Sequence, residues 1–112
     1  MKRVQRLRKK GFNLQEASRS GLPVKYVGRP TKWGNPFRVA DLGAEEAVKR
    51  YKECILNTAM CYTYFDEIEA SIQFDRFKWI AENLEQLRGL DLACFCSLSS
   101  PCHADVLIEL LQ

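Results

Sequence analysis

The sequence predicts a small single α/β domain with a short, mostly parallel sheet and flanking helices. A β-prone run at residues 24–27 leads into a loop with two glycines and two prolines. Helical patterns follow between residues 44 and 87, and an apolar run at 90–96 precedes a second loop and a last helix. The order strand, loop, helices, strand, loop, helix is typical of a crossover unit with parallel strands.

Apolar spacing predicts the helices. The first starts at Ala44, the stretch Asn57–Phe65 is interpreted as a turn or break, and the second helix runs from about Asp66 to Leu87. The last helix is predicted over Pro101–Leu111, because Ser100 followed by proline is a typical helix start. We expect six side chains of the second helix to point into the core: Ile68, Ile72, Trp79, Ile80, Leu84 and Leu87.

The 112 residues fit one domain, which we expect to span residues 23–112 after a basic N-terminal arm or lead-in at 1–22. Residues 1–38 carry eleven Lys or Arg and one acid, whereas residues 39–112 carry six bases and thirteen acids. Such a basic segment favours a phosphate-bearing partner. The alternative is a solvated arm that aids solubility.

The cysteine count predicts a reducing compartment. Five cysteines are an odd number, and no secretory signal opens the chain, so we expect free thiols and a cytoplasmic location. The longest uncharged stretch, 54–65, is too short and too polar to span a bilayer.

The loop Gly28–Phe37 (GRPTKWGNPF) is the first candidate binding segment. Arg29 and Lys32 can neutralise an anion, Trp33 can stack on a base or sugar, and Asn35 offers paired donor and acceptor groups. The alternatives are plain surface charge for Arg29 and Lys32, and core packing for Trp33 and Phe37. Both unusual loops follow a predicted strand, so parallel strands would bring them to one edge of the sheet, where ligands bind.

Three thiols and an imidazole form a candidate zinc set: Cys94, Cys96, Cys102 and His103. Cys94 and Cys96 are two apart on a strand and therefore point to the same side. Two small buried cysteines are the alternative.

The start of the last helix also carries the candidate catalytic residues Cys102, His103 and Asp105. The helix dipole favours a thiolate at Cys102, and His103 can serve as a general acid or base that Asp105 orients. The alternative is that His103 and Asp105 only cap the helix.

The sequence resembles a family of small phage and bacterial proteins of unknown function. The resemblance rests on the GRPTKWGNPF loop, on Cys94-Phe95-Cys96 and on the ending PCHADVL at 101–107, which match the family's GRP(S/T)(K/R)WGNPF and C-(W/F)-C…PCHADVL patterns. The basic opening at 3–11 also resembles the family's usual start, whereas residues 57–75 look like a local elaboration. The resemblance implies functional roles for Arg29, Trp33, Asn35, Cys102, His103 and Asp105, but no established activity.

The leading hypothesis is therefore a nucleotide- or nucleic-acid-directed protein, with an anion pocket between the GRPTKWGNPF loop and the N-terminus of the last helix. Whether it is an enzyme stays open. The alternatives are a non-catalytic nucleotide or nucleic-acid binder and a zinc-stabilised interaction module.

Overall fold

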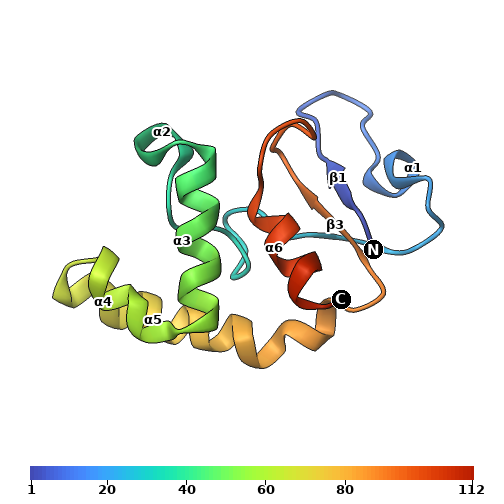
Figure 1. The fold of residues 1–112 in the computed structure, drawn as a ribbon. Helices are drawn as coiled ribbons and strands as arrows, with labels where there is room; N and C mark the ends of the chain where they lie inside the picture. Colours follow the sequence, from blue (N-terminus) through green and yellow to red (C-terminus); the bar gives the residue numbers. More distant parts are fainter.

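A computed structural model describes residues 1–112, and it confirms a small α/β domain with a parallel sheet and flanking helices (Figure 1). The elements in chain order are β1 Arg3–Gln5, α1 Leu14–Ser18, β2 Val24–Tyr26, α2 Val39–Leu42, α3 Ala44–Leu56, the 3₁₀ turn η1 Thr58–Met60, α4 Cys61–Tyr64, α5 Glu67–Asn83, the 3₁₀ turn η2 Leu84–Leu87, β3 Asp91–Cys94 and α6 His103–Leu110. None of the helices combines the length and apolar character that a membrane span needs.

The sheet has three parallel strands in the order β1-β3-β2. All four residues of the central strand β3 are buried, as expected for a parallel strand covered on both sides. Its first residue, Asp91, is fully buried and accepts hydrogen bonds from the Lys2 backbone N–H and the Ser20 hydroxyl. The carboxylate therefore joins the central strand to β1 and to the segment before β2.

The helices pack in successive layers, with one helix on the sheet and the others packed against that helix and each other. Helix α6 packs against β1, β3 and α3, and α3 packs in turn against α5. Figure 1 shows α3 standing beside α6 and α5 passing below both. The hydrophobic core lies between these layers and includes Val27, Tyr51, Phe77, Leu92 and Leu107, each fully buried.

The residues before 23 contain more regular structure than a plain arm. Strand β1 hydrogen-bonds to β3, with Arg3 opposite Leu92, and Val4 is buried. Helix α1 starts at an Asn13 side chain that accepts from the Glu16 N–H. A three-residue strand is too short to give a readable period, which is why the sequence shows only a basic lead-in.

The break predicted at residues 57–65 does separate α3 from α5, but it contains η1 and α4, because Asn57 caps η1 and Cys61 is fully buried. The predicted core face of the second helix was wrong at two positions. In α5, Ile68 and Ile72 are 79% and 56% exposed, whereas Phe77 is fully buried. The face that α5 buries contains Ala70 and Phe77, whose ring packs edge-on against Tyr51, so Ile68 and Ile72 lie outside the buried face.

The start of the last helix was also predicted two residues too early. Helix α6 begins at His103, and Cys102 is its N-cap. Ser100 cannot cap it, because the Arg3 guanidinium holds the Ser100 carbonyl oxygen at 2.8 Å in the preceding loop. This shift places the Cys102 thiol at the helix entrance, facing the end of β3.

Candidate functional site

The two sequence motifs meet at one pocket of about 70 Å³. The first loop contributes Arg29, Asn35 and Phe37 to its wall. The end of β3 and the start of α6 contribute three thiols and an imidazole, from Cys94, Cys96, Cys102 and His103. The parallel sheet produces this meeting, since both loops leave the carboxyl ends of neighbouring strands.

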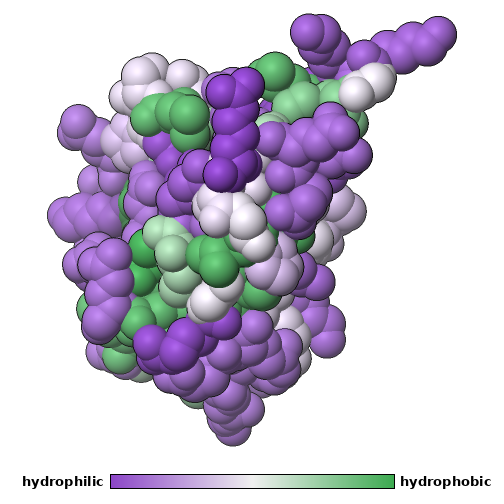
Figure 2. Space-filling model, turned by 90° about the vertical axis from the view of Figure 1, so that its right-hand side faces the viewer, coloured by the Kyte–Doolittle hydropathy of each residue, from purple (hydrophilic) through white to green (hydrophobic).

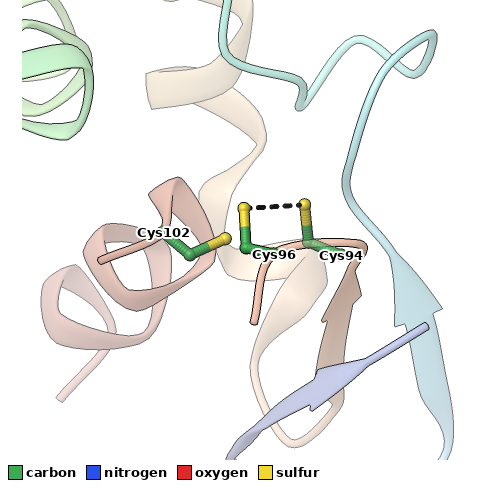
Figure 3. Close-up of side chains that lie close together, drawn as sticks. All are labelled: Cys94, Cys96 and Cys102. Atoms are coloured by element: carbon green, nitrogen blue, oxygen red, sulfur yellow. Dashed lines mark hydrogen bonds between the residues drawn. The ribbon is translucent and has the colours of Figure 1, made fainter. Parts of the chain in front are cut away.

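The thiols of Cys94, Cys96 and Cys102 form one cluster, with all three sulfurs within 4.8 Å of one another. The Cys94 and Cys96 sulfurs are 3.7 Å apart, and Figure 3 shows the Cys102 thiol pointing towards them from the start of α6. A tetrahedral zinc ion with Zn–S bonds of about 2.3 Å separates its sulfur ligands by about 3.8 Å. The spacing and the chemistry of the cluster therefore fit a thiophilic metal ion.

The three thiols of this cluster differ in pKa because each is affected by its neighbours. The neighbouring thiols of Cys102 and Cys96 lower the pKa of Cys94 by stabilising its thiolate. The neighbouring sulfurs of Cys94 and Cys96, together with burial, raise the pKa of Cys102. Cys94 is thus the thiol of the cluster whose pKa is lowered, whereas the pKa values of Cys96 and Cys102 are raised, and a bound metal ion would displace the thiol protons.

His103 lies beside the cluster but does not belong to the group of three. Its Nε2 is 2.8 Å from the Val27 carbonyl oxygen, which can only accept, so Nε2 carries the proton. Burial lowers the pKa of His103 and favours the neutral ring. The unprotonated Nδ1 is then the acceptor that faces the Cys102 sulfur at 3.7 Å.

The pKa shifts at Cys102 and His103 do not favour a thiolate–imidazolium pair between these two residues. A thiolate–imidazolium pair needs a low pKa at Cys102 and a high pKa at His103, and both shifts run the other way. The carboxylate of Asp105 is also engaged, because it accepts from the Cys102 backbone N–H at 3.2 Å and pairs with Arg3 at 3.2 Å. Asp105 therefore positions the N-cap of α6.

The first loop is held by its own polar groups rather than left open. The Asn35 side chain donates to the Ala47 carbonyl at 3.0 Å and accepts from the Phe37 N–H at 2.9 Å. The Tyr51 hydroxyl donates to the Trp33 carbonyl at 2.6 Å. These bonds tie the loop to α3, so the Asn35 amide has a structural partner on each side.

The predicted aromatic and basic residues of this loop separate into different environments. Trp33 is 4% exposed and packs on Trp79, with 4.8 Å between ring centroids. The Lys32 ammonium lies 5.0 Å from the Trp79 ring centroid and does not line the pocket. Arg29 is exposed and does line it. Of the four residues predicted to bind a ligand, Arg29 is therefore the one cation at the pocket.

Two arginines that the sequence analysis did not single out hold the two loops. Arg76 on α5 donates to the carbonyl oxygens of Thr31, Lys32 and Gly34, at 3.0, 3.2 and 2.8 Å. Arg3 on β1 donates to the carbonyl oxygens of Leu98 and Ser100 in the second loop. Nothing in the sequence marks Arg76, whereas Arg3 lies in the basic opening that carries part of the family resemblance.

The comparisons with known proteins place the chain in a family without adding an activity. Neither the curated proteins nor the solved structures provide a match. The family model described as "Domain of unknown function (DUF4326)" matches residues 4–112, and the chain therefore belongs to this family.

Proposed function

We propose that the protein binds one zinc ion through Cys94, Cys96 and Cys102 and receives a phosphate-bearing ligand, a nucleotide or nucleic acid, in the pocket above it. The observation that carries the proposal is that Arg29 and the three thiols line the same pocket. The sequence also left two alternatives, a non-catalytic binder and a zinc-stabilised interaction module, and measurements of zinc content and of anion binding distinguish them from this proposal.

Zinc is favoured by the donor set. Three thiolates are soft ligands, and zinc sites with three protein ligands keep a fourth position for water or ligand, whereas structural zinc sites have four protein ligands. His103 Nδ1 faces Cys102 and stands outside the group of three. The fourth position would then open into the pocket towards Arg29.

The size of the pocket limits what it can receive. About 70 Å³ is well below the roughly 300–1,000 Å³ of pockets that enclose drug-sized ligands. One phosphate group is a better match than a whole nucleoside, and Arg29 supplies the matching charge and planar donor fork. The sugar and base would lie outside the pocket.

The metal part is tested by measuring the zinc content of protein purified without added zinc. We expect about one equivalent, lost in Cys96→Ser and kept in Cys61→Ala, which removes a buried thiol outside the cluster. Wild-type protein that neither retains zinc nor takes it up on reconstitution would refute the metal site.

The anion part is tested by titrating zinc-loaded protein with inorganic phosphate and with a nucleoside monophosphate. Arg29→Gln should weaken both by about tenfold, the loss of one charge-assisted contact. Lys32→Gln is the matched control, because it removes the same charge from the same loop outside the pocket. Equal effects of the two variants would show that the pocket does not hold the phosphate.

A further inference from the structure

Four side chains at the ends of the three strands form a surface that the proposed pocket does not include. Arg6 follows β1, Tyr26 ends β2, Phe95 follows β3, and Arg8 lies next to them; we call this set the arginine–aromatic face. The register pairs Val4 and Tyr26 with Ala93, so alternation along the strands puts Arg6, Tyr26 and Phe95 on one side of the sheet. Cys94 points to the opposite side.

The rings and guanidinium groups of this face hold one another in place. Tyr26 and Phe95 meet edge to face, with 5.8 Å between ring centroids. The Arg6 guanidinium lies 4.7 Å from the Tyr26 ring centroid, and that of Arg8 lies 4.0 Å from the Phe95 ring centroid. Cation–π contact fixes the orientation of each guanidinium plane without using its N–H donors.

The two arginines have no acidic partner. The five salt bridges of the structure involve other residues, and no side-chain hydrogen bond engages Arg6 or Arg8. Figure 2, which faces the side of the molecule that carries β1 and α1, shows mostly hydrophilic residues with smaller hydrophobic patches between them. The positive charges of Arg6 and Arg8 are therefore not compensated by a carboxylate.

The face is continuous with the pocket. The Tyr26 hydroxyl donates to the Arg29 carbonyl oxygen at 2.7 Å, so the aromatic ring and the pocket arginine belong to one rigid turn. Gly28 makes this turn possible, because a Cβ at this position would lie 2.5 Å from the Tyr26 hydroxyl oxygen. A ligand that crosses the ends of the strands would meet Arg29, Tyr26 and Phe95 in turn.

We propose that the arginine–aromatic face binds single-stranded nucleic acid, with Arg6 and Arg8 contacting phosphates and the rings of Tyr26 and Phe95 contacting unpaired bases. The proposal rests on the proposed function and names its ligand as a polynucleotide. Free guanidinium donors match phosphodiesters. The half-buried rings of Tyr26 and Phe95, with the guanidinium planes of Arg6 and Arg8 stacked on them, match unpaired bases, whose faces are not covered as they are in a duplex. The negative charge of the nucleic-acid backbone complements the unpaired charges of Arg6 and Arg8 and the excess of Lys and Arg in residues 1–38.

The test is fluorescence anisotropy with labelled single-stranded RNA and DNA of about ten nucleotides, and with a duplex of the same length. The double variant R6Q/R8Q should weaken single-strand binding at least tenfold and lower the slope of log K against log salt by about 1.4, at about 0.7 per lost phosphate contact. The control K49Q/K78Q removes the same charge from α3 and α5 and should leave both quantities nearly unchanged. Phe95→Ala should weaken binding by about tenfold, and Phe95→Trp should retain it.

Three outcomes would overturn the inference: no oligonucleotide binding by wild type, a duplex bound more tightly than either single strand, or equal effects of R6Q/R8Q and K49Q/K78Q. The first of these, together with phosphate binding that depends on Arg29, would leave the proposed function standing without this face. Oligonucleotide binding that depends on Arg6 and Arg8 but not on Arg29 would support the face and refute the pocket.

Discussion

Replacing Arg3 by methionine tests whether the N-terminal strand holds the site together. Arg3 is the link between β1 and the loop before α6, and its side chain is 9% exposed. It donates to the Ser100 and Leu98 carbonyl oxygens at 2.8 and 2.9 Å and pairs with Asp105 at 3.2 Å. Methionine keeps an aliphatic stem of similar length and removes only the guanidinium.

The size of the effect follows from opposing contributions. Loss of the part-buried bond to Ser100 costs about 2 kcal/mol, and the exposed bond to Leu98 with the half-exposed Asp105 pair adds about 1 kcal/mol. Arg3 Nη1 is buried without a hydrogen-bond partner, so its removal returns about 1 kcal/mol. The net loss of unfolding free energy is about 2 kcal/mol, or about 8 °C in Tm for a domain of this size.

Urea denaturation followed by circular dichroism measures this loss on metal-free protein. A thiol reagent gives a local readout, because a released loop at 97–102 should expose Cys102, which is fully buried, and speed its modification. Arg3→Lys keeps a charge for Asp105 without the planar fork and should fall between wild type and Arg3→Met. A destabilisation of Arg3→Met below about 0.5 kcal/mol, with unchanged thiol reactivity, would refute the reasoning.

Further predictions concern the first loop. Arg76→Met removes three bonds to loop carbonyls and should lower the unfolding free energy by about 2 kcal/mol in urea denaturation; a change within error would show that water replaces those bonds. Asn35→Ala leaves the Ala47 carbonyl and the Phe37 N–H without their partner, so thermal melting should show a loss of about 2–3 kcal/mol, and wild-type stability would mean that the amide is free for a ligand. Gly34→Ala places a Cβ 2.8 Å from Arg29 Cγ and 3.0 Å from the Arg29 backbone nitrogen, so phosphate affinity should fall with the moved arginine. Unchanged phosphate affinity in Gly34→Ala would indicate that Arg29 does not hold the anion.

The sequence predicted the convergence of the two loops because that convergence depends on strand order alone. Parallel strands at 24–26 and 91–94 send both following loops to one edge, and this needs no knowledge of side chains. The neighbouring positions of the Cys94 and Cys96 thiols were predicted from the alternation of side chains along a strand, and they hold although β3 ends at Cys94. Local sequence patterns were therefore enough to predict which backbone segments form the site.

Side-chain roles could not be read in the same way. Trp33 has the chemistry of a stacking platform, but Trp79 covers it, and Trp79 lies 46 positions further along the chain on α5. Asn35 has the chemistry of a ligand-binding amide, but Ala47 on α3 receives its donor. Both outcomes depend on tertiary neighbours that a local motif does not contain. The predicted start of α6 was wrong for a similar reason. Arg3, almost a hundred residues away, donates to the Ser100 carbonyl oxygen and holds Ser100 in the loop before the helix.

The arginines of this protein show how a basic sequence divides its charges between structure and binding. Arg3 and Arg76 are directed at backbone carbonyl oxygens, which are fixed parts of the fold, so neither has its full donor set available to a ligand. Arg6 and Arg8 rest on aromatic rings and form no ion pair, and Arg29 lies at the pocket mouth. Because Arg6, Arg8 and Arg29 follow the carboxyl ends of β1 and β2 and their guanidinium groups donate to no carbonyl oxygen, they are the charges that we propose for binding, whereas the fold itself uses Arg3 and Arg76.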